Sequence, residues 1–308
     1  MRYTERRVFR GILNHCYQRT EEGVVIFYTV SDFLVFFTHF CTTAKRHDVR
    51  VLSLCLMPDH IHHGTYAHDR DVLSGFVRDY TARFSFQHNR TCHYDKKLFE
   101  SPFGSAPKFG GKKTRTNLIY IGNNPVERRL CTKAEDYRWN FLAYAVSPHP
   151  FSAPLVIRRA SLPMCKAIQE IKNSADRLQP LSYRQLQRLF TPLSRPEREQ
   201  LTDYIVSTYN VLDYDAAIQL FGSYENMILA MHATTGSEYD LNEIHIGKSD
   251  ACYAKLSAGV TRRLCLDDIH DLFLLPERER AALLPSLVGQ AEALPEQVSA
   301  FLRLGRKV

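Results

Sequence analysis

Two histidines separated by one residue stand at the start of a segment that follows an apolar run. They lie in residues 58–63, Pro-Asp-His-Ile-His-His, directly after the apolar run 49–57. In a β-strand, side chains at i and i+2 point to the same face, so the imidazoles of His60 and His62 would lie about 7 Å apart along the chain. Such a pair can bind one divalent ion and leaves most of the coordination sphere open, which suits a catalytic metal. His63 would face the other side and is interpreted as structural.

Chance is the alternative explanation for this histidine pair. The chain contains 13 histidines, and six of them fall between residues 60 and 93. A His-x-His pair is expected now and then at this frequency, so both imidazoles could equally be structural. The apolar strand and the proline turn before the pair favour the metal-binding interpretation.

Tyr120 is the candidate nucleophile. It follows a group of basic residues, which are Lys108, Lys112, Lys113 and Arg115. In a continuous helix, Asn124 would lie on the same face one turn later. A phenol beside basic groups and an amide oxygen could attack a phosphodiester while the oxygen helps to hold a metal. Alternatively, Asn124 before Pro125 caps a new helix, and the first helix ends near Gly122.

The positive charge of the chain is concentrated in its first half. The net charge is +7, with 22 Lys and Arg against 14 Asp and Glu in residues 1–150, and 18 against 19 in residues 151–308. An excess of basic residues favours a partner with a phosphate backbone. A solvated surface is the alternative.

Strands and helices alternate in the first half. The hydrophobic pattern predicts strands at 12–19, 49–57 and 60–66, and a short β-rich piece at 24–28. It predicts helices at 31–46, capped by Ser31 or Asp32, and at 71–89, where Phe76, Tyr80 and Phe84 form a core stripe. A loop at 103–113 leads into the helix that contains Tyr120. This order predicts an α+β fold with a ferredoxin-like antiparallel sheet that carries its helices on one face.

A proline-rich segment at 146–154 separates this part from a second, mostly helical part. Three prolines within seven residues oppose both helix and central strand, and the charge changes sign there. We therefore predict a catalytic domain at 1–146 and an all-α accessory domain at 155–308. Its helices are expected at 183–189, 195–209, 213–221, 223–231, 250–256, 266–274, 276–291 and 295–304. The last two could form a helix-turn-helix, with Arg303, Arg306 and Lys307 nearby.

Composition argues against a membrane protein. Mean hydropathy is -0.29, and no run of ~18 apolar residues is present to span a bilayer. The first seven residues are polar and lack the apolar core of a signal peptide. None of the 8 cysteines forms a Cys-x-x-Cys pair, which argues against a zinc ribbon. We expect a cytoplasmic protein with reduced thiols and no membrane partner.

Five segments follow one another in an order that is typical of a known family. They are 14–19 (Asn-His-Cys-Tyr-Gln-Arg), 56–62 (Leu-Met-Pro-Asp-His-Ile-His), 98–103 (Leu-Phe-Glu-Ser-Pro-Phe), 120–126 (Tyr-Ile-Gly-Asn-Asn-Pro-Val) and 134–139 (Ala-Glu-Asp-Tyr-Arg-Trp). Together they resemble the HUH single-tyrosine transposases, specifically the REP-associated tyrosine transposase (RAYT) group. The resemblance covers about residues 8–145.

This resemblance implies a specific chemistry. His60 and His62 would bind Mg²⁺ or Mn²⁺, with Asn124 as third ligand and no small-molecule cofactor. Tyr120 would attack single-stranded DNA at hairpin-forming repeats and leave a 5′-phosphotyrosine and a free 3′-hydroxyl. The chain would then be a transposase, a DNA endonuclease with strand-transfer activity. We assign DNA contacts to Arg19, Lys108, Lys112, Lys113 and Arg115.

Two other functions stay open at this stage, as does the oligomeric state. A non-catalytic DNA-binding regulator could be built on the same scaffold, and it would form no covalent adduct with DNA. An unrelated metal-dependent hydrolase would show no salt-sensitive affinity for DNA. An intact set of His60, His62 and Tyr120 favours the strand transferase, because a protein that only binds DNA has no need of all three.

Overall fold

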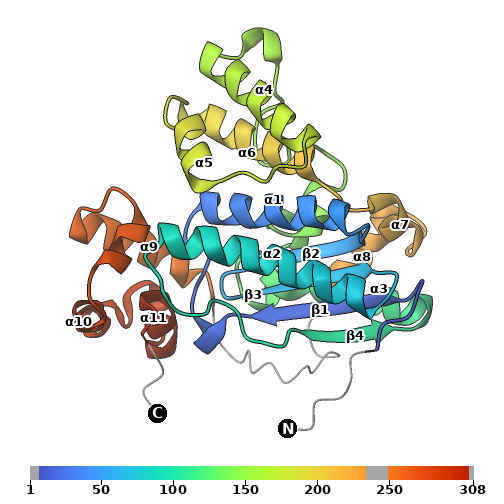
Figure 1. Cartoon of the computed structure of the whole chain (residues 1–308), viewed down its shortest axis with the longest axis horizontal. Helices are drawn as coiled ribbons and strands as arrows, with labels where there is room; N and C mark the ends of the chain where they lie inside the picture. Colours follow the sequence, from blue (N-terminus) through green and yellow to red (C-terminus); the bar gives the residue numbers. More distant parts are fainter. Residues whose placement is uncertain (1–6, 234–248, 305–308) are drawn as a thin grey trace.

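A four-stranded antiparallel sheet forms the centre of the molecule (Figure 1). We describe it from a computed structural model, in which residues 7–233 and 249–304 are described. The strands are β1 (Leu13–Arg19), β2 (Arg50–Met57), β3 (His60–Tyr66) and β4 (Gly104–Lys108), in the spatial order β2-β3-β1-β4. Together with the helices between them, this is the ferredoxin-like arrangement predicted from the sequence. The predicted α+β fold class, including a mostly helical second part, is confirmed.

The β2–β3 hairpin brings the paired histidines onto the sheet. The two strands are joined at Pro58 and Asp59, and Met57 pairs with His60 across the turn. β3 also pairs with β1, so that Arg19 lies opposite His60 and Tyr17 opposite His62. β3 is therefore an inner strand, with a neighbour on either side. The predicted piece 24–28 joins no strand ladder, and Val25 instead donates a backbone hydrogen bond to Ala300.

Two helices cover one face of the sheet (Figure 1). They are α1 (Val30–Arg46) and α2 (Arg70–Thr91), and the predicted stripe of Phe76, Tyr80 and Phe84 is buried between α2 and α1. α1 begins with a capping box, in which Thr29 accepts a hydrogen bond from the backbone of Asp32 and the Asp32 carboxylate accepts one from the backbone of Thr29. The cap is thus Thr29, and the prediction of Ser31 or Asp32 was wrong by a few residues because both ends of a capping box are polar.

A third helix, α3 (Gly110–Glu127), packs on the other face of the sheet, so the prediction that the helices lie on one face was wrong; β2 is buried on both faces, and its second face is covered by the apolar side of α3. Its residues Leu118 and Ile121 lie in one apolar cluster with Leu13 of β1 and Met57 of β2. The predicted loop at 103–113 was wrong. Residues 104–108 form β4, which pairs with β1 at the sheet edge, and the helix begins at residue 110. Pro107 is tolerated in β4 because an edge strand needs fewer backbone donors.

The second half of the chain is mostly helical, as predicted. Its helices are α4 (Leu162–Asp176), α5 (Tyr183–Phe190), α6 (Arg195–Tyr209), α7 (Tyr214–Gln219), α8 (Tyr224–Ala233), α9 (Cys252–Leu264), α10 (Glu277–Leu287) and α11 (Pro295–Leu302). Short 3-10 turns are η1 (Glu21–Gly23), η2 (Ala134–Asp136), η3 (Phe141–Tyr144), η4 (Ile157–Arg159), η5 (Ile269–Leu274) and η6 (Gln290–Glu292). The helix α4 was not predicted from the sequence, and the helix expected at 266–274 is the 3-10 turn η5. Among residues 7–233 and 249–304, no helix combines the length and the apolar composition needed to cross a bilayer.

These helices share buried cores with the sheet. One apolar cluster contains Phe40 of α1 together with Ile171 of α4 and Ile205 of α6. After α6 the chain returns to the sheet edge, where Leu212 forms a parallel bridge with Val51 of β2. The apolar core therefore continues across the proline-rich segment. The division of the chain into domains at 1–146 and 155–308 stays a prediction.

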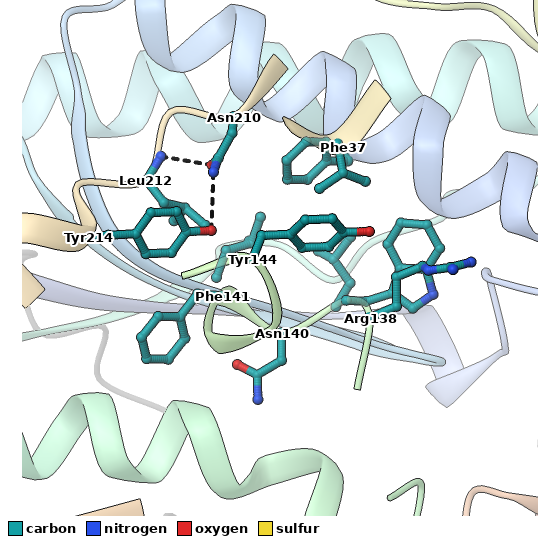
Figure 2. Close-up of a pocket in the computed structure, with 12 residues that line it drawn as sticks. Phe37, Arg138, Asn140, Phe141, Tyr144, Asn210, Leu212 and Tyr214 are labelled. Carbon is teal, nitrogen blue, oxygen red and sulfur yellow. Dashed lines mark hydrogen bonds between the residues drawn. The ribbon is translucent and has the colours of Figure 1, made fainter. Parts of the chain in front are cut away.

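A small cavity lies where this returning segment meets the sheet (Figure 2). Its volume of about 20 Å³ is the room that one water molecule needs. Asn210 shapes one wall, because it accepts a hydrogen bond from the backbone of Leu212 at 3.0 Å and donates one to the Tyr214 hydroxyl at 3.1 Å. None of the predicted site residues lines this cavity.

The pair α10 and α11, proposed above as a helix-turn-helix, lies at one end of α2 (Figure 1). The Arg303 side chain is only 2% exposed, and its guanidinium stacks on Tyr28, Tyr94 and Phe273. It also donates to the backbone carbonyl of Val25 at 3.2 Å. Arg303 thus holds α11 on the core and is not available to DNA, whereas the helix-turn-helix itself stays a prediction. Arg306 and Lys307 lie outside the described residues.

Candidate functional site

The site is built on the face of the sheet that α3 covers. Because side chains alternate along a strand, β3 presents His60 and His62 to this face and His63 to the other. His63 lies among α1 and α2, with its Nε2 atom 3.2 Å from the Tyr80 hydroxyl. Burial lowers the pKa of His63 to about 3, so this imidazole is neutral. The predicted structural role of His63 is therefore consistent with its place in the fold.

The two predicted metal ligands lie next to each other. The ring centres of His60 and His62 are 5.0 Å apart, with the rings at 85°. β1 adds two more side chains to the same face, since His15 and Tyr17 alternate with buried residues that face α1 and α2. The ring centre of His15 lies 5.3 Å from that of His62, and Tyr17 lies 6.5 Å from it.

Tyr120 of α3 packs against this group of rings. Its ring centre is 5.5 Å from that of His62 and 5.5 Å from that of His15, and both contacts are edge-on. The phenol and the two imidazoles of the predicted site therefore meet on one face of the sheet. Tyr120, His15, His60 and His62 are each at most 5% exposed, so these four rings are closed to solvent in the structure, whereas Tyr17 is half-buried.

Asn124 lies on the same face of α3, one turn after Tyr120. Its Oδ1 atom is 3.3 Å from His60 Nε2. α3 runs without a break through Pro125, and Arg128 donates a backbone hydrogen bond to the Asn124 carbonyl. The alternative, in which the helix ends near Gly122 and Asn124 caps a new one, was therefore wrong. The missing N–H of Pro125 removes one bond of the helix, but packing of α3 on the sheet keeps it continuous.

His60 is oriented by its neighbour Asp59. The distance from His60 Nδ1 to Asp59 Oδ1 is 2.5 Å. Burial raises the pKa of Asp59, but the His60 charge and hydrogen bond outweigh it and the net pKa is lowered. A histidine that donates from Nδ1 to a carboxylate keeps its lone pair on Nε2, which is how metal-binding histidines are commonly held.

His62 has a similar neighbour in His15. The distance from His15 Nε2 to His62 Nδ1 is 3.1 Å. In the tautomer in which His62 donates this proton, its own Nε2 keeps the lone pair and His15 accepts. Asp59 thus contacts Nδ1 of His60, and His15 contacts Nδ1 of His62. The sequence analysis missed both roles, although both residues stood in segments that carried the family resemblance.

The donor atoms fit a small divalent ion. His60 Nε2 and Asn124 Oδ1 are 3.3 Å apart, which is short enough for both to bind one small divalent ion. In the neutral tautomer with the proton on Nδ1 both atoms carry lone pairs and would need a cation between them, whereas a ring protonated at Nε2 donates a hydrogen bond to Asn124. In the described part of the chain, no three His, Cys, Asp or Glu side chains come together as a metal site, so an ion here depends on the Asn124 amide.

The second half of the chain also reaches this site. Asp250, just before α9, lies 3.4 Å from the Arg128 guanidinium at the end of α3. Burial, followed by the charge of Asp59, raises the pKa of Asp250 to about 6. Asp59, Arg128 and Asp250 therefore form one charged group beside His60.

The predicted DNA-binding residues lie around α3 and its flanking strands. Lys112 and Lys113 are exposed in the first turn of α3, and Arg19 is exposed at the end of β1. Lys108, at the end of β4, is half-buried. Arg115 is also half-buried and donates to the Leu220 carbonyl at 3.3 Å. Their role in binding DNA stays a prediction.

Comparison with known proteins gives one similarity. No family model matches the chain, and no curated protein matches it. A solved structure of a REP-associated tyrosine transposase bound to a REP hairpin is similar over 51% of this chain and 94% of that one, with 16% identity and a TM-score of 0.41. At this level, the roles of individual residues do not carry over from one chain to the other.

Proposed function

We propose that this protein is a metal-dependent DNA strand transferase that nicks single-stranded DNA through a 5′-phosphotyrosine intermediate. One observation carries the proposal, namely that Tyr120, His60, His62 and Asn124 converge on one face of the sheet although they come from separate elements. A phenol, two imidazoles and an amide oxygen make a set suited to phosphoryl transfer. A fold that needed only to bind DNA gains nothing from this set.

Tyr120 is the nucleophile in this proposal. Its phenolic oxygen attacks the phosphorus, an O–P bond to tyrosine forms, and the bond to the 3′ oxygen breaks to leave a free 3′-hydroxyl. An unperturbed phenol has a pKa of about 10 and is a weak nucleophile at neutral pH. His60, His62 and Asn124 would hold a Mg²⁺ or Mn²⁺ ion, which polarises the phosphate oxygens and so lowers this barrier.

The surrounding residues hold these groups in place. Asp59 and His15 contact Nδ1 of the two histidines and so favour the tautomer in which Nε2 can coordinate an ion. The phenol proton must leave during attack, and the departing 3′ oxygen must gain one. The His15 ring flanks the phenol and can accept its proton, whereas both nitrogens of His62 are engaged in this arrangement. The basic residues around α3 would bind the phosphates of the strand.

The closed state of the site has a mechanistic consequence. Tyr120 and His60 are 5% and 4% exposed, so a phosphodiester reaches them only after the elements around them move. This burial is also the observation that favours the alternative, a non-catalytic DNA-binding regulator on the same scaffold. The two proposals differ in one measurable property, the covalent adduct.

A hairpin assay tests the proposal. A pool of hairpin-bearing single-stranded DNAs, each labelled at either the 5′ or the 3′ end, is incubated with the protein and Mn²⁺ and analysed under denaturing conditions. We expect the 3′ label to migrate with the protein and the 5′ label to be released on a strand with a free 3′-hydroxyl. Tyr120→Phe should abolish the adduct while DNA binding persists.

Tyr17→Phe is the matched control, because Tyr17 lies on the same face beside His62. It should still form the adduct. If the wild-type protein binds DNA but forms no adduct with any divalent metal, the regulator is the better description. Absence of salt-sensitive DNA binding would contradict both, and would favour the unrelated hydrolase.

A further inference from the structure

Two exposed phenylalanines contact each other at one end of α3, with their rings tilted by 58°. The ring centres of Phe9 and Phe109 are 5.2 Å apart, and the side chains are 42% and 48% exposed. Single exposed apolar residues are common on soluble proteins, but an aromatic pair held together in water is a candidate binding surface. The chemistry proposed above leaves this pair without a role.

The pair is held by the sheet and is not part of a loose terminus. Phe9 lies in the turn before β1, where its carbonyl accepts a hydrogen bond from the Ile12 backbone at 3.1 Å. Phe109 directly follows β4 and precedes α3. Because Leu13 of β1 pairs with Lys108 of β4, the two segments are fixed beside each other. The rings are therefore presented by a rigid support.

The surroundings of the pair are basic. Residues 7–13 and 105–115, which flank the pair, contain six lysines and arginines and no aspartate or glutamate. Arg10, Lys112 and Lys113 are exposed, and none of them forms an ion pair within residues 7–233 and 249–304. Burial, and after it the charge of Lys113, lowers the pKa of Lys108, so like charges gather here without a carboxylate to offset them.

We propose that Phe9, Arg10, Phe109, Lys112 and Lys113 form a surface on which the bases of single-stranded DNA stack while its phosphates bind the cations. We name it the aromatic–basic surface. Aromatic rings interleaved with basic residues bind single strands without strict sequence preference, because every base has a flat face to stack. A duplex keeps its bases stacked inside and cannot use the rings in this way.

The surface lies within reach of the proposed nucleophile, and the inference rests on the proposed function. Phe109 and Tyr120 are eleven residues apart along one helix, which corresponds to about 16 Å at 1.5 Å per residue. This distance matches about five nucleotides at the stacked spacing of ~3.4 Å, and fewer in an extended strand. A strand stacked on the surface would thus lead towards the site.

Binding of a fluorescent, unstructured single-stranded oligonucleotide without metal tests the inference. We expect Phe9→Ala/Phe109→Ala to weaken binding about 10-fold or more at fixed salt and to leave the salt dependence unchanged. Lys112→Gln/Lys113→Gln should instead reduce the salt dependence. An oligonucleotide of the same length without bases should bind the wild type and the phenylalanine variant equally. Phe9→Leu/Phe109→Leu, which keeps apolar volume, should weaken binding as the alanines do.

Phe86→Ala is the matched control, since Phe86 is a 69% exposed phenylalanine on α2, across the sheet from α3. It should bind like the wild type. If the phenylalanine variants bind the oligonucleotide as tightly as the wild type, and the wild type still forms the adduct, this inference is wrong and the proposed function stands. If the wild type binds no single-stranded DNA, both are wrong.

Discussion

The contact between Asp59 and His60 leads to a prediction about the affinity of the protein for metal, with different expected losses for different substitutions of Asp59. Asp59 Oδ1 lies 2.5 Å from His60 Nδ1, and the two side chains are 20% and 5% exposed. A short, charge-assisted hydrogen bond of this kind fixes the ring and raises its basicity. Loss of such a partner typically lowers metal affinity by about 10- to 100-fold, or ~1.4 to 2.8 kcal/mol.

Two substitutions of Asp59 should lower the affinity for metal by different amounts. Asp59→Asn can still accept the Nδ1 proton through its amide oxygen, so we expect a loss near 10-fold. Asp59→Ala removes the acceptor altogether, and we expect a loss nearer 100-fold. The measurement is the binding of Mn²⁺ to the protein without DNA, followed by the electron paramagnetic resonance signal of the free ion. Urea unfolding of each variant separates a change in affinity from a change in stability.

Asp69→Asn provides the control. Asp69 also contacts a neighbouring histidine, with 3.0 Å between its Oδ2 atom and His68 Nδ1, but this pair is exposed at the start of α2. Asparagine is as good a helix cap as aspartate, so the variant should bind Mn²⁺ like the wild type. The reasoning is refuted if both Asp59 variants bind Mn²⁺ as tightly as the wild type.

Three further predictions concern stability, each measured by urea unfolding. Arg303→Ala should lower the free energy of unfolding by about 3 kcal/mol, because it removes a buried side chain stacked on three rings; an unchanged value would mean that α11 is held by other contacts. Burial, with Arg83 and Arg46 nearby, lowers the pKa of His39 to about 4, below the value near 6.5 in the unfolded chain. The unfolded chain therefore binds this proton more readily, and the free energy of unfolding decreases as the pH falls from about 6.5 to about 4. Between neutral pH and about pH 4 the wild type should lose about 3 kcal/mol more than His39→Leu, and an equal loss in both would contradict the assignment. Gly104→Ala should cost about 1–3 kcal/mol, since a Cβ there overlaps the Tyr17 ring; a variant as stable as the wild type would show that the ring moves freely.

The sequence was sufficient to predict that the proposed metal ligands lie side by side, but not to predict which residues surround them. The spacing of His60 and His62 predicts that both side chains lie on one face of a strand, because alternation along a strand is a local property. The neighbours His15 and Asp59 could not be identified in the same way. His15 meets His62 only through the pairing of β1 with β3, a contact between residues far apart in the chain.

Elements whose stability comes from packing were also missed. β4 has the sequence Gly-Ser-Ala-Pro-Lys, which contains no alternating apolar pattern, and it is a strand because β1 offers it an edge. α3 continues through Pro125 because it is packed on the sheet and against α8, whereas local rules favour a break there. Tertiary packing outweighs local propensity in both cases.

α3 carries three of the features discussed above on one uninterrupted rod. Phe109 stands at its start, and Tyr120 and Asn124 follow on one side. At Gly122 the helix lies so close to Met231 of α8 and to Leu142 that an added Cβ would lie 2.8 Å from the Met231 sulfur. Because α3 is one unbroken helix, any displacement of its first turn would carry the Tyr120 phenol and the Asn124 amide oxygen with it, so entry of DNA and alignment of the nucleophile would be coupled.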